Sequence, residues 1–161
     1  MNQLKKISLT ALTALSLVGA SVALLPQSAS ATTNGIDTTV VDEKWGKPTF
    51  IYGGGLSESQ ITETEELLNI KNPENVAVGS VTGQDLINYL GEGSGNTSSM
   101  ISSVLVQKQD TGEGVDVEIV TPENISQITQ DQYANAAITA GVNDVKIEVA
   151  SVSKVTGESA L

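Results

Sequence analysis

The side chains of this sequence that could do chemistry are carboxylates, hydroxyls and lysine amines. Its 161 residues include no cysteine and no histidine, and all eight basic residues are lysines. Without histidine there is no Ser-His-Asp or Cys-His nucleophile and no imidazole ligand for zinc or haem. The lack of cysteine excludes disulfides and iron-sulfur clusters, and the lack of arginine excludes the bidentate clamp for phosphate. We therefore expect no cofactor, and only a carboxylate-dependent enzyme stays open as a catalytic alternative.

Three acidic residues near position 110 form the most suggestive carboxylate group. Asp110-Thr111-Gly112 has the sequence of the aspartic protease triplet, but those enzymes need two such carboxylates facing each other, and one lies here in a predicted turn. Asp110, Glu113 and Asp116 could hold calcium weakly, although their spacing does not match the twelve-residue loop that ends in a bidentate glutamate. A tight turn in a solvated acidic hairpin is the favoured interpretation, with no metal site.

A run of three glycines precedes a predicted helix start. Gly53-Gly54-Gly55 comes just before Ser57, which places free backbone N–H groups where an anion could bind. Glu58 replaces the third glycine of a dinucleotide fingerprint, and its charge would repel a pyrophosphate. A plain tight turn is therefore favoured, and Gly54, Gly55 and Ser57 are weak candidates for a binding site.

Three of the five aromatic residues lie within eight positions: Trp45, Phe50 and Tyr52. Such a group could form a platform on which a sugar ring stacks. Burial is the favoured interpretation, because a core with so few large rings needs them inside. We expect Trp45 to dock on this core.

The N-terminal region has the pattern of a secretory signal peptide. Lys5 and Lys6 form a short positive region, residues 7–25 carry no charge, and Pro26 precedes Ala29-Ser30-Ala31. The small residues at 29 and 31 predict cleavage between Ala31 and Thr32, which defines a signal peptide over 1–31. We therefore expect a secreted or cell-wall associated protein with no membrane span after the signal is removed.

The net charge of the chain is −11, and removal of the signal peptide leaves six lysines against 19 acids, a net charge of −13. An acidic chain without arginine would release no counterions from a nucleic acid, so nucleic acid is excluded as a partner. The partner that we expect is an unidentified component of the cell envelope or the extracellular medium.

The mature chain divides into a polar lead over 32–48 and a domain over 49–161. The lead has no hydrophobic periodicity, which predicts flexibility. The first half of the domain follows a β-α-β plan. Its predicted elements are a strand over 49–52, a helix capped by Ser57 and Gln60 that ends near Asn72-Pro73, a strand over 75–81, and a short helix over 82–90 capped by Thr82 and Asp85.

The second half repeats this plan after a predicted hairpin. Its elements are strands over 101–109 and 115–120, a helix capped by Thr129 and Gln132 and closed by Gly141, and a strand over 145–149 with one wet face. Residues 156–161 are either an interrupted helix or a frayed tail. The expected fold class is α+β, with two β-α-β-like units that share one mixed sheet of four or five strands and carry helices on one face.

Four short motifs occur in an order that resembles a known family. They are Gly55-Leu56-Ser57, Tyr89-Leu90-Gly91, Ser102-Ser103 and Ala140-Gly141-Val142. In this order they are similar to the YpuA-like secreted proteins of Gram-positive bacteria, a domain of unknown function. The resemblance covers roughly residues 49–161. It implies that family members continue into a largely helical C-terminal part that this chain lacks, and it brings no catalytic residues.

Two functions of different classes stay open from the sequence. The first is an exported, non-catalytic binding or interaction module at the bacterial cell envelope, favoured by the signal peptide and by the missing nucleophile-base pair. The alternative is a carboxylate-dependent hydrolase of cell-wall polymers, which would need two opposed carboxylates in a cleft. With 19 acids, some pair meets that spacing by chance.

Overall fold

The computed structural model describes residues 35–91 and 93–161. The predicted signal peptide and its cleavage site between Ala31 and Thr32 lie outside these residues. Within this part, no helix combines the length and the apolar character that a membrane crossing requires. The helices and strands in chain order are β1 (Thr49–Gly53), α1 (Glu58–Leu67), β2 (Ala77–Val81), α2 (Gly83–Leu90), β3 (Ser102–Lys108), β4 (Val115–Ile119), α3 (Gln130–Thr139) and β5 (Val145–Ser151).

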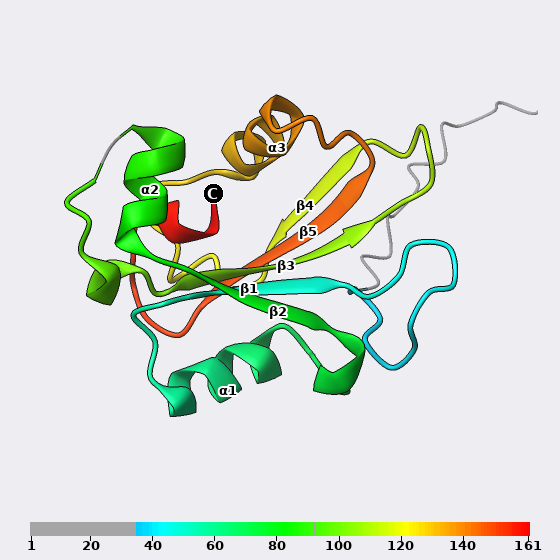
Figure 1. Ribbon diagram of the computed structural model, residues 1–161, viewed down its shortest axis with the longest axis horizontal. Coiled ribbons are helices and arrows are strands. Elements are labelled where there is room, and N and C mark those ends of the chain that lie inside the picture. Colours follow the sequence, from blue (N-terminus) through cyan, green and yellow to red (C-terminus); the bar gives the residue numbers. More distant parts are fainter. Residues whose placement is uncertain (1–34, 92) are drawn as a thin grey trace, which may run out of the picture. The chain divides into compact units, whose positions relative to one another are not determined.

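The five strands form one mixed sheet in the order β2-β1-β3-β5-β4 (Figure 1). β1 pairs in parallel with β2 and β4 pairs in parallel with β5, while β3 runs antiparallel between β1 and β5. The α+β class, the mixed sheet and the two β-α-β units are therefore confirmed. The predicted hairpin between β3 and β4 is wrong, because β5 lies between them and pairs with both.

All three helices begin with the capping box that their sequences predict. In each helix, the side chain of the N-cap residue accepts a hydrogen bond from the backbone N–H of the residue three positions later. The side chain of that later residue accepts one from the N–H of the N-cap residue. The pairs are Ser57 with Gln60, Thr82 with Asp85, and Thr129 with Gln132. Each box satisfies two N–H groups that a helix start leaves without intrahelical partners, so the starts follow from local sequence.

The first helix ends earlier than the sequence predicts. α1 stops at Leu67 because Asn69 adopts a left-handed conformation with φ of 52°. The N–H of Ile70 then donates to the carbonyl of Glu65, and that of Asn69 to Glu66, which closes the helix before Asn72-Pro73 is reached. At α3 the predicted stop is confirmed, since Gly141 has φ of 84° and plays the same part.

The helices cover both faces of the sheet. On one face Phe50, Leu105 and Ala150 pack with Leu68 at the end of α1. On the other face Ile147 of β5 packs with Tyr133 of α3. Figure 1 shows α1 on one side of the sheet and α2 and α3 on the other.

The expectation that the helices lie on one face is therefore wrong, because the sheet has apolar side chains on both sides, such as Leu105 on one and Val104 on the other, and each side needs a cover. In each β-α-β unit the chain passes from its first strand to the parallel neighbour on the β2 side, from β1 to β2 and from β4 to β5. The helices of the two units lie on opposite faces of the sheet. Their connections consequently have opposite hands, whereas such connections are almost always right-handed. Two right-handed connections would have placed both helices together.

The last strand has no wet face, contrary to the prediction. All seven residues of β5 are buried, Lys146 and Glu148 included. The segment before β1 provides part of the cover, because Ile36 joins the core and its N–H donates to Glu148 Oε1 at 2.6 Å. Ile36 of the predicted flexible lead is thus packed against the sheet, while Val40 and Val41 of the same segment are exposed.

The C-terminal residues form a short 3-10 turn, Glu158–Ala160, instead of an opening helix or a frayed tail. Ser159 is buried, and its Oγ accepts the N–H of Ser102 at 3.0 Å. The hydroxyl of Tyr133 in α3 donates to the carbonyl of Gly157 at 2.8 Å. These bonds attach the turn to both β3 and α3.

Candidate functional site

A groove of about 530 Å³ lies where the segment before β1 meets the end of β3, and we call it the polar groove. The residues that line it come from two stretches of the chain. They are Asp37, Val40, Asp42, Lys44 and Trp45 on one wall, and Gln107, Lys108, Gln109, Asp110 and Glu113 on the other. Every one of these side chains except that of Val40 carries a charge or an amide or indole N–H group, so the groove suits a polar ligand.

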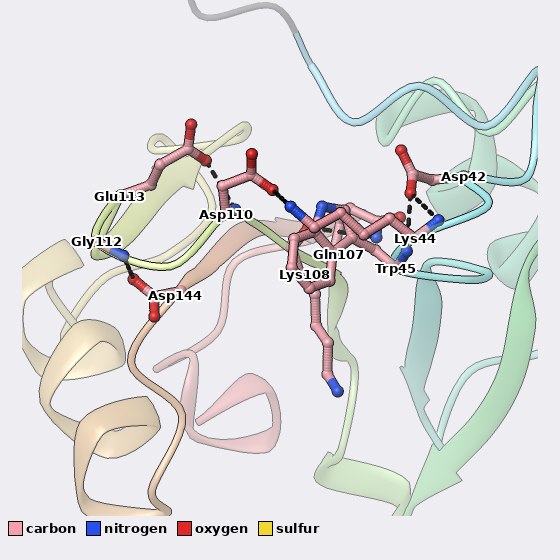
Figure 2. Close-up of polar contacts among 9 residues, drawn as sticks. All are labelled: Asp42, Lys44, Trp45, Gln107, Lys108, Asp110, Gly112, Glu113 and Asp144. Atoms are coloured by element: carbon pink, nitrogen blue, oxygen red, sulfur yellow. Dashed lines mark hydrogen bonds and ion pairs between the residues drawn. The ribbon is translucent and has the colours of Figure 1, made fainter.

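One wall of the polar groove is a tight turn organised by Asp42. Its Oδ1 accepts the N–H groups of Lys44 at 2.8 Å and Trp45 at 2.7 Å (Figure 2). Its carbonyl accepts the N–H of Gly46. Gly46 has φ of 75°, a conformation that glycine adopts without the strain of a side chain. The turn therefore holds the half-buried Trp45 in a defined place beside the groove.

The other wall is the connection between β3 and β4, which is attached to the start of β5. Asp144 Oδ1 accepts the N–H groups of Gly112 at 2.8 Å and Gly114 at 3.0 Å, while its carbonyl accepts that of Gln109. Within the turn, the N–H of Asp110 donates to Glu113 Oε2 at 3.1 Å. These bonds to backbone N–H groups fix the shape of this wall.

Lys44 connects the two walls. Its Nζ lies 2.5 Å from Asp110 Oδ1 and 4.3 Å from the centre of the Trp45 ring. Both charged side chains are more than half exposed, so the ion pair contributes only about 0 to 1 kcal/mol. A ligand can displace such a pair at little cost and gain access to the indole and the carboxylate.

Gln109 has an amide oxygen that is buried without a hydrogen-bond partner in the wall of this groove. Sequence reasoning missed Gln109, Asp42 and Asp144. For Asp42 a local signal existed, since aspartate side chains often accept the N–H two residues further along the chain and so form a turn. Asp144 acts across 30 residues or more, so no local pattern marks it.

The acids that could hold calcium by their order in the sequence are not brought together. Asp110 and Glu113 share the turn, but the Asp116 carboxylate lies 3.8 Å from the ammonium of Lys146. Among residues 35–91 and 93–161 there is no group of three acidic side chains that could hold a metal ion. The Asp110-Thr111-Gly112 triplet lies in a turn, as predicted.

The glycines before α1 allow neighbouring backbone segments to pack closely against them. The N–H of Gly54 donates to the carbonyl of Val81 and that of Gly55 to Met100, both at 2.8 Å. A side chain at either position would come within 3 Å of neighbouring backbone atoms. The Ser57 N–H is likewise engaged, with Gln60 Oε1. The weak candidates Gly54, Gly55 and Ser57 therefore present no free N–H group from these positions to an anion.

The three neighbouring aromatic residues divide between core and groove. Phe50 is fully buried, and Tyr52 packs against it with ring centres 6.0 Å apart. Trp45 lies at the polar groove and not in the core on which we expected it to dock. A platform made of all three rings does not form.

A serine-lysine spacing that sequence reasoning missed also has a structural explanation. Ser151 and Lys154 are three residues apart, as in serine enzymes that use a lysine. Here Ser151 ends β5, is fully buried, and donates through its Oγ to the carbonyl of Ser153. Its hydroxyl is not placed to attack a substrate.

Glu148 is the buried acid that the alternative hydrolase would need. Burial raises its pKa, with smaller upward contributions from Glu118 and Asp116, while the Ile36 N–H and Lys146 act in the opposite direction. Glu118 and Glu148 occupy paired positions on β4 and β5. Neither residue lines the polar groove. A hydrolase needs its two carboxylates in a cleft that admits the substrate. Glu118 and Glu148 do not provide such a pair in the polar groove.

Comparison with known proteins gives a family match and a bacterial relative. The model of the family described as "Protein of unknown function (DUF1002)" matches residues 52–161. The "Uncharacterized protein YpuA" of Bacillus subtilis (strain 168) is 34% identical over 126 residues, which are 76% of this chain and 42% of the relative. The chain thus spans less than half the length of that relative. No solved structure matches. The extent of the family match and the identity to this relative show that the chain belongs to the YpuA-like DUF1002 family of proteins of unknown function.

Proposed function

We propose that this domain is an exported, non-catalytic binding module of the bacterial cell envelope, and that its polar groove binds a polyhydroxylated wall polymer beside Trp45. The signal peptide expected over residues 1–31 supports the location. The groove supports the ligand class, since polyols are bound by an aromatic ring together with polar side chains that accept or donate hydrogen bonds.

The observation that carries the proposal is that Trp45 lines the polar groove together with Asp42 and Asp110. The indole gives an apolar face, and the carboxylates of these two acids are acceptors for ligand hydroxyl groups. Gln107 and Gln109 add amide groups on the opposite wall. Sites for small ligands usually combine a concave apolar part with a few polar groups that fix orientation, and this groove has both.

Co-sedimentation with purified cell-wall sacculi tests the proposal. Because Trp45 is the only tryptophan of the chain, soluble wall fragments that enter the groove should also change its fluorescence. We expect Trp45→Ala to lose at least about tenfold in wall affinity, whereas Trp45→Phe keeps most of it. Tyr89→Ala is the matched control, since Tyr89 is an exposed aromatic residue outside this groove.

Equal binding by Trp45→Ala and the unaltered domain would contradict this assignment of the groove. Release of soluble sugar fragments by the purified domain, abolished by Glu148→Gln, would instead support the carboxylate-dependent hydrolase. The two results use different residues, so the experiment separates the two functions.

A further inference from the structure

A second concave surface is lined by residues of α2, α3 and the C-terminal turn. Figure 1 shows these three elements on the same side of the sheet. It consists of three adjoining hollows of about 470, 440 and 190 Å³. The first two share Leu86 and Leu90, the first and third share Ala136 and Ala140, and Leu161 lines all three. We call this continuous surface the α2–α3 groove.

The α2–α3 groove exposes large apolar side chains. Tyr89 is 85% exposed, Leu90 41% and Leu161 38%. Leu86 and Leu90 are four residues apart on one face of α2, yet only Leu86 is buried. Among residues 35–91 and 93–161, the main contacts of α2 are with the two short turns 97–99 and 158–160, and Tyr89 and Leu90 of α2 stay exposed. Contiguous exposed apolar surface of this kind marks an interaction site.

The charged residues of the α2–α3 groove indicate which kind of partner it can bind. Asp85 and Glu158 are the charged residues among those that line the three hollows, and both are acidic. Two copies of the chain joined through this surface would bring these acids together, in a protein whose net charge is already −11. An occupant with lysine or arginine beside its apolar face would instead be attracted.

We propose that the α2–α3 groove binds an amphipathic helix of another exported protein, whose apolar stripe is flanked by lysine or arginine. Helices lie in grooves through anchors spaced at i, i+3 or i+4, and i+7. The eight residues of α2 rise about 12 Å, so the wall that they form matches roughly two turns of a partner helix. The partner would place an apolar anchor beside Leu90 and Leu161 and a basic residue beside Glu158.

Fluorescence anisotropy with two labelled model helices of about 18 residues tests this proposal on the chain without its predicted signal peptide. Both peptides carry the same leucine stripe, flanked by lysines in one and by glutamates in the other. We expect the lysine peptide to bind at least about tenfold more tightly, with a preference that decreases as salt is added. Failure of both peptides to bind, or equal binding by both, would overturn the proposal.

Variants of residues that line the α2–α3 groove test this assignment, and a variant of an exposed residue outside the groove is the matched control. Leu90→Asp and Tyr89→Ala should each weaken binding of the lysine peptide at least about fivefold, whereas Ile138→Asp should leave its affinity within about twofold. Ile138 is 52% exposed on α3 but does not line the groove. Thermal melts confirm that each variant folds, and Tyr89→Ala removes only an exposed ring. Equal weakening by Ile138→Asp, or a concentration-dependent dimer that Leu90→Asp abolishes, would overturn the assignment of this surface to a basic helix.

Discussion

Glu148 connects the first described residues of the chain to the centre of the sheet. This residue is 3% exposed, and its carboxylate accepts the N–H of Ile36. A buried carboxylate is costly when ionised unless several donors compensate, and the structure provides one close backbone donor and the nearby Lys146. We therefore expect the protonation of this side chain to affect the stability of the domain.

The raised pKa of Glu148 predicts a pH dependence of a defined sign. Since the pKa lies above its ordinary value of 4.5, the folded state binds this proton more tightly than the unfolded state. The contribution of Glu148 to the free energy of unfolding is greatest below pH 4.5 and decreases as the pH rises through the folded-state pKa. Glu148→Gln, whose amide oxygen still accepts the Ile36 N–H, should lack this decrease. Urea unfolding at several pH values measures it.

The quantity to measure is the difference in the free energy of unfolding between the wild-type protein and Glu148→Gln at each pH. Asp37 and Asp85 have lowered pKa values, because threonine hydroxyl and backbone N–H groups donate to them. Their stabilising contributions are lost as the pH falls, the opposite sign to Glu148, and they are common to both proteins. Wild-type and Glu148→Gln profiles that run parallel from pH 4.5 upwards would show that Glu148 does not titrate as proposed.

At the scale of single elements, helix starts were predictable and pairing partners were not. Each start rests on two residues three positions apart, such as Thr129 and Gln132, so the signal is contained in the local sequence. The position of β5 between β3 and β4 depends on contacts between residues far apart in the chain. The end of α1 was also missed, because its left-handed residue is Asn69 and not the glycine that usually marks a helix end.

The capping box of α3 gives a prediction at this scale. Thr129→Ala removes the hydroxyl that accepts the N–H of Gln132 at 3.3 Å, and it should lower the free energy of unfolding by about 1 kcal/mol. Thr139→Ala in the last turn is the control, because Thr139 is exposed and alanine favours helix. Chemical denaturation compares them. Equal losses in both variants would indicate that the box does not stabilise α3.

At the scale of the whole molecule, the site depends on residues that are far apart in the sequence. Lys44 and Asp110 meet across the polar groove although they are 66 positions apart. Sequence reasoning grouped Trp45 with Phe50 and Tyr52 because they are neighbours in the chain, yet the strand carries the latter two into the core. Residue types alone led us to favour a non-catalytic binding or interaction module over a hydrolase, while the location of the polar groove required the fold.

Export is the last property to test at this scale, and it concerns residues outside the described part. If the signal peptide is cleaved as predicted, N-terminal sequencing of secreted protein should read from Thr32. Ala31→Tyr should block processing, because the cleavage site needs a small residue there, and precursor should accumulate with the membrane fraction. Thr32→Ser should leave secretion unchanged. Processing at this position retains Ile36 and its bond to Glu148, so secreted protein should unfold like the purified domain. An intact Met1 on membrane-bound wild-type protein would contradict export and remove the main support for an envelope function.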